Sequence, residues 1–199
     1  MSLTLRASLL ALWVTVSANA QTRTLALYAG PAHGLDLKAN AVMRAELDRL
    51  LAPAGIEVVW KSLAARRAGE NFDLVAVGSF EGSCATDETP GGQIARSLAD
   101  TSIADGHILP FFRIDCTRLV RMLGPQYEPA VLGRALARLV GHEIYHIVAQ
   151  TTEHRGKGLA KASFSIPDLT DTEFDLDLSS LARMRTTFST RSPEMASRK

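Results

Sequence analysis

Two histidines four residues apart, with a glutamate beside the first, are the side chains whose types and spacing best suit a chemical role. His142, Glu143 and His146 form the pattern H-E-x-x-H. Residues four apart on an α-helix project from one face, so both imidazoles can reach one metal ion. The glutamate can then address a water bound to that ion. Because neutral imidazole nitrogens are good ligands for Zn²⁺, the pattern predicts a site for one zinc ion.

The segment that carries this pattern is predicted to be the longest helix of the chain. The helix starts near Pro129, a residue tolerated in the first helical turn, and ends around Gln150. Its apolar residues recur at helical spacing and form a broad face, which consists of Val131, Leu132, Leu136, Leu139, Val140, Ile144, Ile147 and Val148. A helix predicted from periodicity alone therefore presents the two histidines together.

A catalytic zinc site needs a third protein ligand, and the sequence offers two candidates. His154 follows the helix, whose end near Gln150 leaves a few residues for the chain to swing back toward the metal. Glu173 is the best-placed carboxylate further along the chain. We favour His154, which lies between a helix end and a glycine-containing turn, and keep Glu173 as the alternative.

The N-terminus has the features of a signal peptide over 1–20. A basic residue, Arg6, precedes an apolar stretch at 9–16, and Ala18 and Ala20 form an A-x-A cleavage pattern. The apolar stretch is shorter than the roughly 20 residues that span a bilayer, so we expect cleavage near Ala20 rather than a membrane anchor. The mature protein is then secreted or periplasmic, without membrane association.

The rest of the chain has the composition of one globular domain, which we place at 21–188, followed by a flexible tail at 189–199. Hydrophobic residues make up 46% of the 199 residues, so the chain can bury a sizeable core. The 22 basic residues nearly balance the 21 acidic ones, and no long basic run occurs, so we expect no nucleic-acid partner. The oligomeric state stays open, with a monomer favoured.

The chain has two cysteines, Cys84 and Cys116. An even cysteine count in an exported protein predicts one disulfide, because the destination compartment is oxidising. The alternative is two buried free thiols. Neither cysteine belongs to a C-x-x-C pair, so the sequence does not support a cysteine-based zinc site.

The order of the predicted elements indicates an α+β domain. Short β-branched and aromatic segments bounded by turn residues predict strands at 24–28, 56–60, 72–77, 101–105 and 108–114. Pro110 in the last of these argues for an edge strand or a bulge. Further helices are predicted at 37–51 and, shorter, at 178–185. We therefore expect a twisted mixed sheet of about four to five strands, packed on the metal-binding helix and a second helix.

The segment HEIYHIVAQTTEHRGKG, residues 142–158, resembles the zincin metallopeptidases, and looks most like small secreted bacterial metzincin-like proteins with H-E-x-x-H-x7-H. The resemblance implies a minimal zincin domain with the activity of a zinc metalloendopeptidase. It implies His142, His146 and His154 as zinc ligands and Glu143 as the general base. It also implies a peptide or protein substrate, which would pair as an extended strand with the short edge segment at 101–105.

The segment also departs from the typical metzincin pattern. The spacing to His154 is two residues longer, Tyr145 replaces a glycine common inside the motif, and Gly158-Leu159-Ala160 stands where relatives have a methionine turn. These departures motivate a second hypothesis, a non-catalytic exported module that binds peptide or uses zinc structurally. A metal-free exported binding domain is a third.

No residue beyond the metal ligands and Glu143 can be assigned to the reaction from the sequence. The oxyanion of a peptidase would rest chiefly on zinc. Tyr127, Tyr145 and His107 are candidates for additional stabilisation by their chemistry alone, and Tyr145 is expected to point roughly away from the metal-facing side of the helix.

Overall fold

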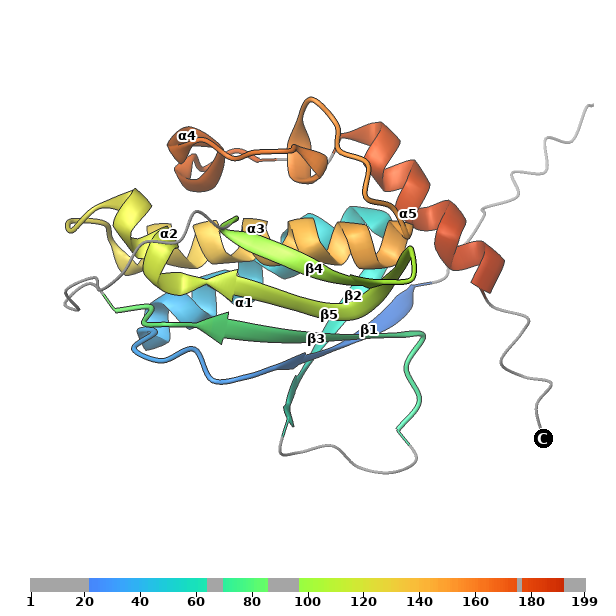
Figure 1. Cartoon of the computed structure of the whole chain (residues 1–199), viewed down its shortest axis with the longest axis horizontal. Helices are drawn as coiled ribbons and strands as arrows, with labels where there is room; N and C mark the ends of the chain where they lie inside the picture. Colours follow the sequence, from blue (N-terminus) through green and yellow to red (C-terminus); the bar gives the residue numbers. More distant parts are fainter. Residues whose placement is uncertain (1–21, 64–69, 86–96, 175–176, 192–199) are drawn as a thin grey trace, which may run out of the picture.

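The structure is a computed structural model, which describes residues 22–63, 70–85, 97–174 and 177–191. The predicted signal peptide lies outside these residues. In chain order (Figure 1) the elements are β1 (Arg23–Ala29), α1 (Leu37–Leu51), the 3-10 turn η1 (Ala52–Ala54), β2 (Ile56–Ser62), β3 (Leu74–Glu81), β4 (Ala99–Ala104), β5 (His107–Asp115), α2 (Cys116–Leu123), α3 (Pro129–Ala149), the 3-10 turn η3 (Gly158–Ala160), α4 (Ile166–Thr170) and α5 (Leu178–Arg191).

The five strands of the described residues form one mixed sheet in the order β2-β1-β3-β5-β4. β2, β1, β3 and β5 run parallel, and β4 pairs antiparallel with β5 at the edge. Parallel neighbours need a crossover connection, which α1 provides between β1 and β2. The predicted α+β domain with a mixed sheet is therefore confirmed.

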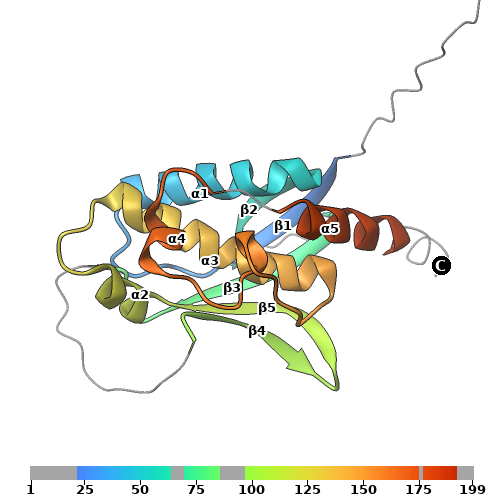
Figure 2. The ribbon, with the colours of Figure 1, turned by 90° about the horizontal axis from the view of Figure 1, so that it is seen from above.

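The predicted second helix, 37–51, is confirmed as α1, which packs beside α3 over the sheet (Figure 2). α1 begins after Asp36, whose carboxylate accepts hydrogen bonds from the backbone N–H groups of Lys38 and Ala39. It ends at η1, after which Gly55 takes a left-handed conformation with φ of 75°. The buried residues of α1 join the same hydrophobic core as those of α3.

α3 lies between the sheet and the C-terminal segment that follows it (Figures 1 and 2). Every residue at 135–149 is buried, as expected for a helix covered on all sides. Gly133 lets α1 come close, because a Cβ atom at this position would lie 2.5 Å from the carbonyl oxygen of Ala39. The helix ends where predicted, since Gln150 adopts a left-handed conformation with φ of 47°.

The structure decides between the two interpretations of Pro110. β5 lies between β3 and β4, so the edge-strand interpretation is wrong. The bulge interpretation is confirmed, because the β4–β5 register shifts between Thr101 and Ile103, and Pro110 lies in the corresponding part of β5. The pairing of β5 with β3 begins only at Phe111, so the missing N–H of the proline interrupts no ladder.

Several boundaries differ from the predicted ones. β3 begins and ends later than the predicted strand. It ends later because Gly78 continues the strand and lies against the ring of Phe112, where a Cβ atom would have no room. β4 begins earlier, and Asp105 lies in the turn with φ of 50°. α5 continues to Arg191, so the predicted tail at 189–199 starts inside a helix, and 192–199 lie outside the described residues.

Two short helices have no counterpart in the prediction. α2 begins after Asp115, whose carboxylate accepts from the N–H of Arg118, and only Cys116 and Leu119 are buried in it. α4 begins with a reciprocal capping box between Ser165 and Asp168. Both helices are too short for an apolar period to stand out, so local capping is the signal that could have revealed them.

Cys84 and Cys116 form a disulfide, as predicted, and the bridge ties the segment after β3 to the first residue of α2. Both cysteines are buried in the hydrophobic core. Among the helices of the described residues, none is both long and apolar enough to cross a bilayer.

Candidate metal centre

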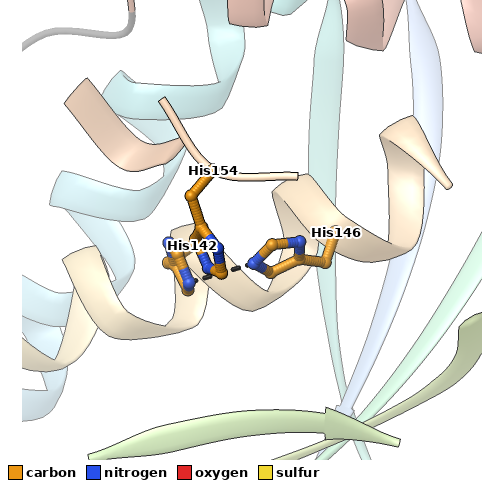
Figure 3. Close-up of side chains that lie close together, drawn as sticks. All are labelled: His142, His146 and His154. Atoms are coloured by element: carbon orange, nitrogen blue, oxygen red, sulfur yellow. Dashed lines mark hydrogen bonds between the residues drawn. The ribbon is translucent and has the colours of Figure 1, made fainter. Parts of the chain in front are cut away.

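Three histidines converge on one side of α3 (Figure 3). His142 and His146 project from the helix one turn apart, and His154 comes from the segment that follows it. The ring centroids are 4.5 Å apart for His142 and His146, 4.9 Å for His146 and His154, and 5.3 Å for His142 and His154. One nitrogen of each ring lies within 4.8 Å of the other two, so the three could hold a metal ion.

Backbone carbonyls determine which nitrogen of each helix histidine carries a proton. Nδ1 of His142 contacts the carbonyl oxygen of Leu159, and Nδ1 of His146 contacts that of Thr151 at 2.6 Å. A carbonyl can only accept, so both Nδ1 atoms must donate. Burial lowers the pKa of His142 to about 4 and also lowers that of His146, so both rings are neutral near pH 7. Their Nε2 atoms are therefore unprotonated.

The two unprotonated Nε2 atoms face each other at 3.0 Å. Without a proton between them, two lone pairs at this distance repel each other, and a cation placed between them turns the repulsion into coordination. Tetrahedral zinc with Zn–N bonds of about 2.0–2.1 Å would set two ligand nitrogens roughly 3.3 Å apart. The donor pair is therefore already close to the spacing that a zinc ion requires.

The path of the chain after α3 explains how His154 returns to the helix. The left-handed conformation of Gln150 turns the chain, and the N–H of Glu153 donates to the hydroxyl oxygen of Thr151. The N–H of Arg155 then donates to the carbonyl oxygen of Ala160, which closes the following turn. His154 is exposed, whereas the two helix histidines are buried, so the shared point is most open to solvent on the side of His154.

Glu173, the alternative third ligand, does not belong to the histidine cluster. Within the described parts of the chain, His142, His146 and His154 form the one group of three or more possible ligands that could hold a metal ion. Glu173 lies with Lys161, Asp168 and other charged residues around a separate hollow of about 340 Å³. The geometry thus favours His154, the ligand preferred from the sequence.

Glu143 lies beside the cluster and is almost completely buried, with 2% of its surface exposed. One carboxylate oxygen, Oε1, is 4.0 Å from Nε2 of His142. The other, Oε2, accepts a hydrogen bond of 2.5 Å from the hydroxyl of Thr101 in the edge strand β4. Burial raises the pKa of Glu143 to about 7, although the Thr101 hydrogen bond acts in the opposite direction. A carboxyl group with this pKa can both accept and release a proton at neutral pH.

The segment 158–164 includes Gly158-Leu159-Ala160, which stands where the metzincin pattern has a methionine turn. It contributes the Leu159 carbonyl that contacts His142, and the ring of Phe164, which packs edge-on against the same imidazole at 5.4 Å. Met184 lies buried in α5. An aromatic ring and a backbone carbonyl therefore support the first histidine.

The three candidates for oxyanion stabilisation lie in different places. Tyr145 is buried in α3 with its ring 5.4 Å from that of His146. His107 is exposed at the start of β5, and Tyr127 packs against the hydrophobic core just before α3. Sequence reasoning missed Thr101 as a partner of Glu143, since the two are 42 residues apart and only the tertiary fold brings them together.

A comparison with solved structures agrees with this description of the fold, whereas comparisons of the sequence found no match. No protein-family model matches the chain, and no curated protein sequence matches it. Among solved structures, the chain is similar to the crystal structure of archaemetzincin from Methanopyrus kandleri, with a TM-score of 0.52 and 11% sequence identity. The similarity covers 87% of this chain and 99% of that one. At this identity it shows the fold, which is zincin-like as the sequence predicted.

Proposed function

We propose that this protein is a zinc-dependent metalloendopeptidase of a small secreted metzincin-like type, with one zinc ion bound by His142, His146 and His154. The observation that carries the proposal is the three-histidine cluster, in which the Nε2 atoms of His142 and His146 lie 3.0 Å apart and one nitrogen of each of the three rings lies within 4.8 Å of the other two. The buried carboxyl group of Glu143 beside that pair supplies the proton acceptor that hydrolysis requires.

Each residue of the site has a separate part in the proposed reaction. His142, His146 and His154 would hold the zinc ion, which would supply a Lewis acid able to activate a water and to polarise a peptide carbonyl. Glu143 accepts a proton from the attacking water at Oε1 and donates it to the leaving amine. Thr101 holds Oε2, so that Oε1 is the oxygen that faces the histidines.

The edge strand β4 supports a peptide or protein as the substrate. Among the strands that the structure describes, β4 has a partner on one side only, and Ser102, Ile103 and Ala104 in it are exposed. An extended peptide can add to such an edge through main-chain hydrogen bonds. Because Thr101 of the same strand contacts Glu143, a peptide on this edge would run past the proposed general base.

Zinc content and hydrolysis of a broad peptide library test the proposal on the purified mature chain. We expect one zinc per chain and hydrolysis that a chelator abolishes. Glu143→Gln should keep zinc and lose hydrolysis, whereas His154→Ala should lose both. Glu153→Gln is the matched control, since this neighbouring side chain is exposed and pairs with Arg183.

The outcomes separate the competing functions. Stoichiometric zinc without hydrolysis of any peptide would support the non-catalytic zinc-binding module instead. Absence of zinc binding would refute the metal site and leave a metal-free binding domain. Hydrolysis that persists in Glu143→Gln would refute the proposed general base.

The proposed export rests on the N-terminal sequence, and the disulfide is compatible with an oxidising compartment. We expect that the exported protein starts at Gln21. N-terminal sequencing of the exported protein checks this cleavage site, and an intact Met1 would refute it.

A further inference from the structure

Four side chains on α3 stand at four-residue intervals, and each donates to backbone carbonyls of the chain that follows the helix. They are Arg134, Arg138, His142 and His146. Residues four apart lie along one face of a helix, so the row follows α3 from its first turns to its last. The accepting carbonyls all belong to 151–171, which therefore lies along this face.

The last two members of the row are proposed metal ligands, and the chain that covers them determines how their rings are turned. The Leu159 carbonyl fixes the Nδ1 proton of His142, and Phe164 packs against the ring. Phe164 in turn lies 6.2 Å from the ring of Phe174, measured between centroids. The orientation of His142 thus depends on the position of 159–174 over α3.

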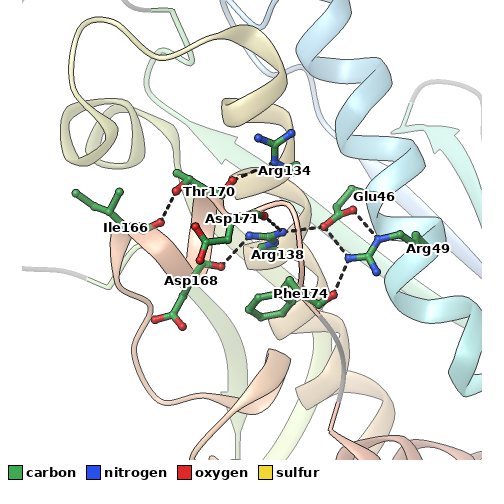
Figure 4. A network of polar contacts seen from close by, with 9 residues as sticks. All are labelled: Glu46, Arg49, Arg134, Arg138, Ile166, Asp168, Thr170, Asp171 and Phe174. Atoms are coloured by element: carbon green, nitrogen blue, oxygen red, sulfur yellow. Dashed lines mark hydrogen bonds and ion pairs between the residues drawn. The ribbon is translucent and has the colours of Figure 1, made fainter.

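Arg138 lies one turn before His142 and, together with Arg134, which donates to the carbonyl oxygen of Thr170, holds this segment (Figure 4). Arg138 makes contacts with it at several points. Its guanidinium donates to the carbonyl oxygens of Asp168 at 3.0 Å and of Asp171. It also lies 4.6 Å from the centre of the Phe174 ring. Arg138 has no exposed surface, so these carbonyls and the ring replace the water that would otherwise solvate the charge.

A buried carboxylate on α1 balances the charge of Arg138. Nη2 of Arg138 is 3.2 Å from Oε1 of Glu46. The Glu46 carboxylate also accepts from Arg49, at Oε2 from Nε and at Oε1 from Nη2. Arg49 donates to the carbonyl oxygen of Phe174 at 2.6 Å, so the segment is held from α1 as well as from α3. Burial alone would raise the pKa of Glu46, but the two arginines outweigh it and lower the pKa.

We infer that Arg138 is a positioning residue for the metal centre: it fixes 159–174 over α3, and this segment holds His142 in the orientation that binds metal. The inference rests on the metal site of the proposed function. An alternative is that the network of Glu46 and Arg138 only stabilises the fold. If Arg138 positions the metal centre, its replacement changes the metal affinity of the folded protein. If the network only stabilises the fold, the replacement leaves that affinity unchanged.

Zinc affinity measured by competition with a chromophoric chelator tests the inference on the full mature chain. We expect Arg138→Met to weaken zinc binding by about 10- to 100-fold, the usual effect of removing a residue that orients a metal ligand. Glu46 keeps its two hydrogen bonds from Arg49 in this variant, so no buried charge is left unpaired. Arg138→Lys keeps the positive charge but loses the planar guanidinium, so its zinc affinity should lie between those of Arg138→Met and the wild type.

A second readout needs no metal. Trypsin can cut after Lys161, which lies in the segment 159–174 that Arg138 is inferred to hold, and after Arg155 and Lys157, which directly precede this segment. In the metal-free protein, we expect these bonds to be cut faster in Arg138→Met than in the wild type, with the products identified by mass spectrometry. Asp73→Asn is the matched control, because it also removes an ion pair. This pair joins Asp73, the residue before β3, to Arg23 in β1 and does not involve the segment 159–174.

The results separate this inference from the proposed function. Wild-type affinity and wild-type cleavage in folded Arg138→Met would overturn the inference and leave the proposed function standing. An equal loss of zinc affinity in Asp73→Asn would also overturn it, since general destabilisation would then be the cause. If Arg138→Met does not fold, Arg138→Lys decides by the same two measurements. A wild-type protein that binds no zinc would overturn both.

Discussion

Replacing Thr101 by valine removes the hydroxyl that donates to the carboxylate of Glu143 at 2.5 Å and, in a longer contact of 3.4 Å, to its backbone carbonyl oxygen. Valine has nearly the same shape and suits the edge strand β4 equally well. The shorter of these bonds joins the Thr101 hydroxyl to Oε2 of Glu143, a residue with 2% of its surface exposed. A hydrogen bond to a charged group contributes about 1.5–3 kcal/mol, and water cannot easily replace it at this depth.

This free energy sets the size of the expected effect on hydrolysis. Because 1.36 kcal/mol corresponds to a factor of ten in the ionisation equilibrium of Glu143, a smaller fraction of this base is ionised without the bond, and kcat/KM at neutral pH should fall by about 10- to 150-fold in Thr101→Val. The bond favours the ionised carboxylate, so its loss should raise the pKa of Glu143 above the value of about 7 that burial produces. The acidic limb of the pH–rate profile should therefore move to higher pH.

The assay is hydrolysis of a zinc-dependent peptide substrate between pH 5 and pH 9, at matched zinc content. Thr101→Ser is the control, because it restores the hydroxyl and should recover most of the activity. Unchanged kcat/KM together with an unchanged acidic limb in Thr101→Val would refute the role assigned to this bond. Loss of zinc from Thr101→Val would show instead that the threonine supports the metal ligands.

Three further predictions concern stability. Replacing Cys84 and Cys116 by alanine opens a bridge with a sequence separation of 32, which should lower the free energy of unfolding by about 3–4 kcal/mol in urea denaturation. Gly133→Ala places a Cβ atom 2.5 Å from the backbone of α1 and should lower it by about 1–3 kcal/mol, whereas Gly156→Ala meets nothing within 4 Å and serves as the control. Burial alone would raise the pKa of Asp168, but hydrogen bonds and the nearby Lys161 outweigh it and lower this pKa to about 2. The ionised carboxylate therefore stabilises the fold above about pH 4, and this stabilisation is lost toward pH 2. The difference in free energy of unfolding between the wild type and Asp168→Asn should vanish over that range.

Each of these predictions has a contradicting result. An unchanged urea midpoint after loss of both cysteines would mean that the bridge does not restrict the unfolded chain. Equal stability of the Gly133 and Gly156 variants would contradict the close approach of α1 and α3. If the stability difference between the wild type and Asp168→Asn grew as the pH falls, the prediction that the ionised carboxylate stabilises the fold would be wrong.

The sequence by itself determined the helix that carries the site and the chemistry that the site could perform. Periodicity placed α3 and α1 correctly because both helices are long enough for an apolar face to stand out. The H-E-x-x-H spacing then brought His142 and His146 to one side of α3 without knowledge of the fold. β-Branched and aromatic segments bounded by turn residues placed most strands, but α2 and α4 were missed because one or two turns carry no clear period.

Only the tertiary structure decided the contacts that connect distant parts of the chain. The return of His154 and the exclusion of Glu173 from the cluster depend on how the chain folds back after Gln150. The bond from Thr101 to the glutamate joins residues 42 apart, and the Arg138 network joins α1 and α3 to the C-terminal segment. Helical spacing is a local property of the chain, whereas these contacts depend on how packed elements are placed relative to one another, which no short pattern in the sequence records.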